Sequence, residues 1–215
     1  SVTGNRTLTA TAGILDVDTN VTGDADVLLI GGASTMLSGS VHANGELDIS
    51  GGDVTMDGTA QSLTAGGLLD INVSNVSAND SLAISGGAGT ELAGNLSATT
   101  NLTISGGDVT TEAAAAQISA GGELGITVAN VNADDSLTLT GTGGTSISGD
   151  VTAANDLTID GGTVTMNGAG QSLTASAGAL DINVGAVNAD DALTLDSATG
   201  TTIGGNVTAA TDLTL

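Results

Sequence analysis

The composition of this chain excludes several classes of protein before any motif is considered. Its 215 residues carry 24 Asp+Glu against one Lys+Arg, a formal net charge of −23, so a basic nucleic-acid-binding face is excluded. No apolar run approaches the ~20 residues that span a bilayer, so membrane insertion is not expected. The absence of Cys excludes a disulfide framework, and the absence of Phe, Trp and Tyr argues against a conventional aromatic-rich core.

The sequence repeats itself with a period of about 55 residues. Segments 47–55, 102–110 and 157–165 read LDISGGDVT, LTISGGDVT and LTIDGGTVT. A second marker, VSANDSL at 76–82, returns as VNADDSL at 131–137 and as VNADDAL at 187–193, where the interval is one residue longer. We therefore divide a single domain, residues 1–215, into a partial repeat 1–20, repeats 21–75, 76–130 and 131–186, and a partial repeat 187–215.

A shorter pattern, apolar-x-Ala-x-x-x-apolar-x-apolar, recurs within the repeats. In chain order it starts at residues 41, 63, 76, 96, 118, 131, 151, 173, 187 and 207. The alternation of apolar and polar residues predicts short β-strands with Leu, Ile and Val facing inward and Thr and Ser facing outward. Gly-Gly, Asn-Asp and Asp-Asp pairs predict turns between these strands, and no segment has a helical period.

Short strands of this kind can bury their apolar faces only by stacking on one another. A parallel stack has little interior room for aromatic rings, and strands paired on both sides need every backbone N–H, which fits the absence of Pro. We expect an all-β parallel β-solenoid with about three rungs per repeat, hence about 12 rungs in a rod of roughly 55 Å. Two wider rungs of about 27 residues per repeat remain the alternative.

Three segments resemble the haemagglutinin repeats of filamentous-haemagglutinin-type exoproteins: VHANGELDI at 41–49, LSATTNLTI at 96–104 and ISAGGEL at 118–124. Those proteins are very large bacterial adhesins, commonly exported by two-partner secretion, with right-handed parallel β-helical shafts. The resemblance covers nearly the whole chain and implies a right-handed β-helix that is secreted or exposed on the bacterial cell surface. The family's secretion domain and effector or receptor-binding parts are not recognisable here, so the resemblance implies a shaft and not a tip.

The chain offers few side chains for chemistry. His42 is the only His, and without Cys or a second His it cannot complete a transition-metal site, so we expect a solvated surface side chain. No catalytic residue and no cofactor site is expected. The segment 86–91, GGAGTE, partly matches a calcium-binding nonapeptide but occurs once in full.

Recurrent acidic turns are the strongest candidate for a site. They contain Asp80, Asp134, Asp135, Asp190 and Asp191. With three rungs per repeat, these turns would recur at one corner about 14 Å apart, beyond the Debye length of about 8 Å at physiological salt. We interpret them as spaced charges that keep the rod soluble. Calcium bridging between rods is the alternative, because carboxylate oxygens are hard ligands.

We expect this chain to be the structural shaft of a large adhesin, holding a binding tip away from the cell. A host or cell-surface receptor would then be bound by regions outside this chain. The alternative is a self-assembling extracellular filament or biofilm-matrix fibre, because the sequence begins and ends within the repeat pattern and open solenoid ends expose unpaired strands. An enzyme is not expected, since a polysaccharide-cleaving site needs clustered carboxylates, cations or aromatic platforms.

Overall fold

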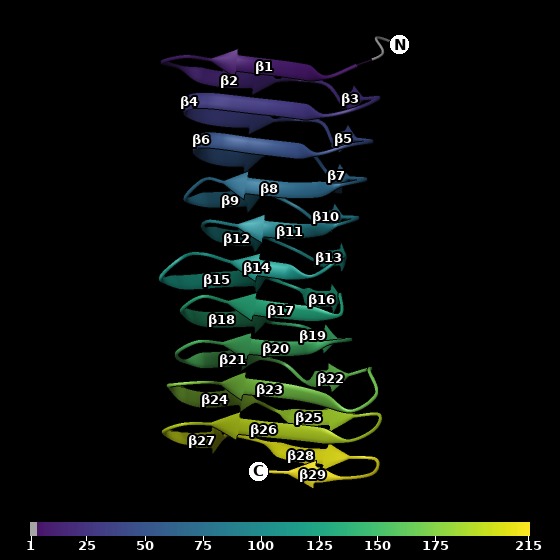
Figure 1. Cartoon of the computed structure of the whole chain (residues 1–215), viewed down its shortest axis with the longest axis vertical. Coiled ribbons are helices and arrows are strands. Elements are labelled where there is room, and N and C mark those ends of the chain that lie inside the picture. The colour runs from purple at the N-terminus through teal and green to yellow at the C-terminus, as the bar shows by residue number, and fades with distance from the viewer. Residues whose placement is uncertain (1–3) are drawn as a thin grey trace.

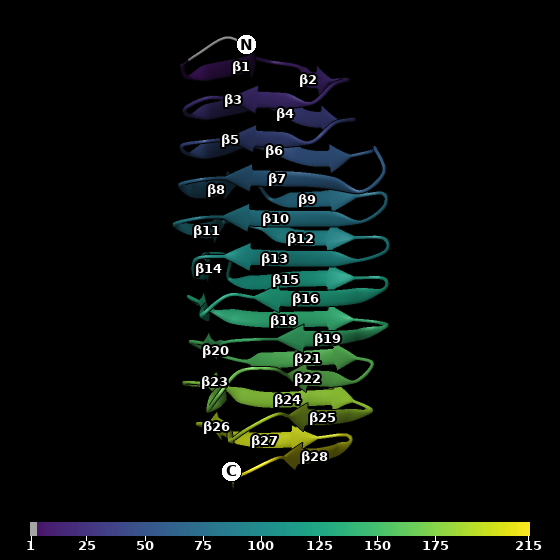
Figure 2. The ribbon, with the colours of Figure 1, turned by 90° about the vertical axis from the view of Figure 1, so that its right-hand side faces the viewer.

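A computed structural model describes residues 4–215 as a rod of stacked turns, with the two termini at opposite ends (Figures 1 and 2). Over this range the chain forms strands and no helix, and the strands pair in parallel. There are about ten turns of roughly 21 residues, each with three faces. The predicted all-β parallel β-solenoid is therefore confirmed. Residues 1–3, which belong to the partial repeat 1–20, lie outside the described range.

Each face is a column of strands, one from every turn. Face 1 consists of β1 (Arg6–Ala10), the first part of β4 (Val27–Leu37), the first part of β6 (Leu47–Met56), β8 (Leu68–Asn72), β11 (Gly89–Leu92), β14 (Val109–Thr111), β17 (Asn130–Ala133), β20 (Asp150–Ala153), β23 (Gln171–Ala175), β26 (Leu193–Ser197) and β29 (Leu213–Thr214). Face 2 consists of β2 (Ile14–Val17), the second parts of β4 and β6, β9 (Asn75–Ala78), β12 (Asn95–Ala98), β15 (Ala115–Ala120), β18 (Ser136–Gly141), β21 (Leu157–Gly161), β24 (Ala179–Val184) and β27 (Gly200–Ile203).

Face 3 is a separate sheet of ten strands, seen at the front of Figure 2. It consists of β3 (Val21–Gly23), β5 (Val41–Ala43), β7 (Gln61–Ala65), β10 (Leu82–Gly86), β13 (Leu102–Gly106), β16 (Glu123–Thr127), β19 (Gly144–Ile147), β22 (Val164–Met166), β25 (Ala186–Ala189) and β28 (Asn206–Ala209). Faces 1 and 2 form one sheet of 19 strands because β4 and β6 continue around the corner between them.

The core is a set of aliphatic columns that run along the rod. On face 3, Leu82 pairs with Leu102 and Leu102 with Leu124, and all three are at most 2% exposed. A second column begins two residues later at Ile84. Burying one such side chain stabilises a fold by about 1.5–3 kcal/mol, so every interior turn is held by its neighbours on both sides. The predicted inward Leu, Ile and Val positions are confirmed.

The winding explains how the long sequence repeat fits a turn of roughly 21 residues. Leu47, Leu102 and Leu157 are equivalent in the repeat, yet they lie on faces 1, 3 and 2. Each repeat therefore supplies eight face segments, which is two and two-thirds turns. This excludes two wider rungs per repeat, and the estimate of about 12 rungs was too high. Ten turns give a rod of roughly 48 Å.

The Gly-Gly pairs of the repeat form corners. Because each repeat advances by eight face segments, these pairs lie at a different corner in each successive repeat. Gly51, Gly106 and Gly161 have φ of 111°, 111° and 120°, a conformation that other residues rarely adopt. A Cβ atom on Gly51 would lie 2.1 Å from the carbonyl oxygen of Gly31, one turn earlier. Glycine is therefore required at these corners both by the backbone angle and by the close approach of the preceding turn.

Candidate functional surfaces

The acidic turns do not lie at one corner, so that expectation was wrong. Asp80 follows β9 and leads to face 3, Asp135 follows β17 and leads to face 2, and Asp191 follows β25 and leads to face 1. The reason is the winding: a shift of eight face segments carries each repeat to a different face. The acidic turns are spread around the rod as well as along it.

Each of these aspartates is bonded to the next turn. Asp80 accepts a hydrogen bond from Thr100 Oγ1 at 2.9 Å, and Asp191 accepts one from Thr211 Oγ1 at 2.8 Å. Asp135 accepts one from Asn155 Nδ2. In all three pairs the donor comes 20 residues later and is equivalent in the repeat. These carboxylates link successive turns, a function that sequence reasoning did not assign to them.

The neighbouring Asp134 and Asp190 are exposed at the same turns. Across residues 4–215, no three His, Cys, Asp or Glu side chains gather in an arrangement suited to a metal ion. Calcium bridging between separate rods is a different arrangement and stays a prediction. His42 is exposed and its Nε2 lies 3.0 Å from Asn44 Oδ1, which confirms the predicted solvated position. The segment 86–91 forms the corner between β10 and β11.

A ladder of three carboxylates on face 1 escaped the sequence analysis. Asp48 pairs in register with Asp70, and Asp70 with Glu91, so three successive turns carry a carboxylate at the same outward position. Burial raises the pKa of Asp48, and the negative charges of Asp70 and Glu46 raise it further, against a lowering hydrogen bond from Ser50. Like charges directly opposite one another destabilise a sheet, so this ladder is a local weakness at neutral pH.

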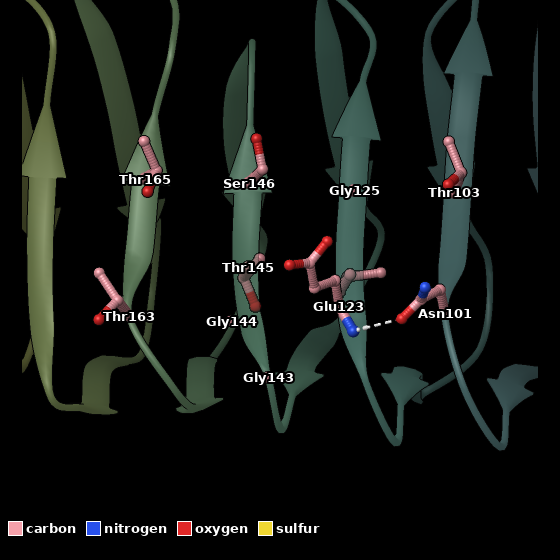
Figure 3. A pocket seen from close by; sticks show the side chains of 11 residues that line it. Asn101, Thr103, Glu123, Gly125, Gly143, Gly144, Thr145, Ser146, Thr163 and Thr165 are labelled. Carbon is pink, nitrogen blue, oxygen red and sulfur yellow. Dashed lines mark hydrogen bonds between the residues drawn. The ribbon is translucent and has the colours of Figure 1, made fainter.

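A shallow groove of about 340 Å³ lies on face 3 around Gly125 (Figure 3). Thr103, Gly125, Ser146 and Thr165 succeed one another in register, and Gly125 leaves a gap in this outward row. Glu123 stands at the edge, where its backbone N–H donates to Asn101 Oδ1 at 2.9 Å. The groove offers hydroxyl groups and one carboxylate to a polar solute. Its lining residues include no cation and no nucleophile paired with a base.

No protein-family model, curated protein or solved structure matches this chain significantly. No helix in the described part of the chain is long and apolar enough to cross a membrane. The fold itself defines the class: the chain is a β-helix repeat protein whose repeat advances by eight face segments on a three-faced coil.

Proposed function

We propose that this chain is the rigid shaft of a large secreted or surface-exposed adhesin, as its resemblance to filamentous-haemagglutinin-type repeats implies. The observation that carries the proposal is the unbroken pairing of turns on all three faces around one aliphatic core. A rod of this kind acts as a spacer. Its length is set by the number of turns, and each turn adds about 4.8 Å. The binding tip and its receptor contacts would lie outside this chain.

Side chains near the corners support a stiff shaft, because they add hydrogen bonds between turns to those that the backbone makes there. Ser40 Oγ accepts the backbone N–H of Ser62 at 2.9 Å. Its repeat equivalents Asn95 and Asp150 accept the backbone N–H groups of Gln117 and Ser172 at 3.0 and 2.7 Å. Each repeat contributes one such bond, and the three bonds lie at the starts of strands on three different faces. Neighbouring turns are thereby joined between the faces as well as on them.

Deletion of residues 76–130 tests the shaft. Residue 131 is equivalent to residue 76, so the junction restores the repeat and the rod should lose eight face segments, about 13 Å of length. Small-angle X-ray scattering should show this shortening with an unchanged cross-section. In the parent adhesin, the same deletion should bring the tip closer to the cell and leave receptor binding intact. Loss of receptor binding on deletion would contradict the spacer function.

A further inference from the structure

The carboxylates of the rod are unevenly distributed over its three faces. The strands of faces 1 and 2 carry Asp16, Asp48, Asp53, Asp70, Glu91, Asp150, Asp160, Asp181 and Asp196. Within residues 4–215, the ten strands of face 3 carry one carboxylate, that of Glu123 on β16, and no Lys or Arg. In a chain with a formal charge of −23, face 3 is therefore the least charged of the three faces.

Hydroxyl groups occupy the outward positions of face 3 instead. Two rows of side chains run along the rod in register, the first formed by Thr64, Ser85, Ser105 and Thr127 and the second by Thr103, Gly125, Ser146 and Thr165. Part of the second row is seen in Figure 3, where Gly125 leaves the gap that forms the groove. Side chains that succeed one another in a row are about 4.8 Å apart. Face 3 is thus a regular surface of hydroxyl groups.

A hydroxyl surface is able to bind a copy of itself. A Ser or Thr hydroxyl both donates and accepts a hydrogen bond, so two identical rows satisfy one another. A row of carboxylates has only acceptors and repels its own copy. An interface between two identical subunits related by a two-fold axis uses the same surface on both, and it therefore requires such self-complementarity. Ser and Thr are short side chains, and Thr is stiff at χ1, so ordering them in a contact costs little entropy.

We propose that two copies of this chain associate laterally, with face 3 of one rod against face 3 of the other. The ten strands of this face are spaced by about 4.8 Å and are roughly 14 Å long, so they form a surface of roughly 700 Å² on each partner. Specific protein interfaces of standard size bury about 800 Å² per partner, so the available area suits a specific pair. Pairing concerns the rod itself and does not depend on whether the shaft carries a binding tip.

Face 2 is the nearest competitor, because its strands β9, β12, β15 and β18 carry no carboxylate. The corners that lead from face 1 into β15, β18 and β21 contain Glu112, Asp134, Asp135 and Asp156. Along β13, β16, β19 and β22, by contrast, the corners on both sides of face 3 contain only Asp108. Two rods therefore approach each other with less repulsion through face 3 than through face 2.

The carboxylates on the rest of the rod determine how pairing depends on salt. Two rods that each carry a formal charge of −23 repel each other at long range. The Debye length is about 30 Å at 0.01 M ionic strength and about 3 Å at 1 M, so high salt removes this repulsion and leaves short-range hydrogen bonds in place. At pH 7 we expect separate rods in 0.01 M NaCl and pairs in 1 M NaCl.

Sedimentation and small-angle X-ray scattering at pH 7, in chelator and at both salt concentrations, test the pairing on the 215-residue chain. A lateral pair has twice the mass per unit length of a single rod and keeps the length of roughly 48 Å. A chain that stays a 20.3 kDa monomer in 1 M NaCl would overturn the proposal, as would assemblies that are longer than one rod but no thicker. A monomeric rod of the expected length would leave the shaft proposal standing.

Matched substitutions identify the face that pairs. Thr103→Glu adds a carboxylate to face 3, and Thr138→Glu adds one to the uncharged stretch of face 2. Thr103→Glu should weaken pairing about tenfold, because each partner then brings a like charge into the contact, whereas Thr138→Glu should leave pairing nearly unchanged. A greater loss of pairing with Thr138→Glu than with Thr103→Glu would overturn the assignment to face 3.

Removing a carboxylate gives a test that does not depend on a disruptive substitution. Glu123→Gln and Glu91→Gln make the same chemical change on face 3 and face 1. Glu123→Gln should allow pairing at a lower salt concentration than the parent chain requires, and Glu91→Gln should shift that concentration less. Equal shifts for the two variants would overturn the interface, because they would show that only the total charge of the rod matters.

Discussion

Two glycines in adjacent turns of face 3 should respond oppositely to alanine. Gly106 has φ of 111°, and a Cβ there would lie 2.3 Å from the carbonyl oxygen of Gly86 in the turn beneath. The backbone angle alone costs about 1–3 kcal/mol for a non-glycine residue. Because the close atom is backbone, the turns must also separate locally. We therefore expect Gly106→Ala to destabilise the rod by about 3 kcal/mol or more.

Gly125 is the matched control, because it lies in β16, the strand of face 3 that follows the strand β13 containing Gly106. A Cβ on Gly125 would meet no atom closer than 3.9 Å, and it would partly fill the face 3 groove. Glycine in a strand interior costs about 0.5–1 kcal/mol relative to alanine, so Gly125→Ala should stabilise the rod by that amount.

Thermal unfolding followed by far-UV circular dichroism measures both changes, since the chain has no aromatic residue to report by fluorescence. For a domain of this size, 1 kcal/mol shifts Tm by about 2–4 °C. Gly106→Ala should lower Tm by about 6–12 °C, and Gly125→Ala should raise it by about 1–4 °C. Equal shifts for the two variants, or an unchanged Tm for Gly106→Ala, would refute the reasoning from backbone angle and turn spacing.

Four other outcomes follow from the side chains. Thr90 is 1% exposed and its hydroxyl has no partner among residues 4–215, so Thr90→Val should raise stability by about 1 kcal/mol in urea unfolding, whereas Thr90→Ser should not. Gln171→Ala should cost about 1–3 kcal/mol in the same assay, because two carbonyl groups lose their donor. The raised pKa of Asp48 means that its contribution to stability is present below 3.8 and is lost as pH rises through the folded-state value. Asp48→Asn should therefore flatten the pH dependence just above 3.8 and be more stable than the parent chain at pH 7, and equal slopes would contradict the ladder. Light scattering should show separate rods at pH 7 and lateral bundles near pH 4 or in millimolar calcium, and bundling that is equal in chelator at pH 7 would contradict control by the carboxylates.

The strands and their inward residues could be predicted because they depend on local alternation. The nine-residue pattern at 76–84, for example, covers most of β9, a corner and the first part of β10. The winding could not be predicted from that pattern, because strands such as β11 and β14 do not fit it. A weaker signal was present at the true turn length: NVSANDSLAISGG at 75–87 resembles NLSATTNLTISGG at 95–107, one turn later.

Because the turn length was not evident from the sequence, the carboxylate ladder was missed and the acidic turns were assigned to a single corner. Alignment at the repeat period compares positions on different faces, whereas residues that touch are about 21 apart. Asp48, Asp70 and Glu91 are not equivalent in the repeat and meet only through the winding. Asp80 and Asp135 are equivalent and are separated by it. Chemistry that depends on neighbouring turns becomes visible only once the turn length is known.

The mismatch between repeat and turn also has a mechanical consequence. If the repeat were a whole number of turns, its glycine corners would align along one edge of the rod, and that edge would be its weakest line. Because eight segments are wound on three faces, the glycine corners of successive repeats lie on different edges of the rod. Only after three full repeats does a corner return above its own position. The flexible glycine corners are thereby distributed over all three edges of the rod, and no edge collects them.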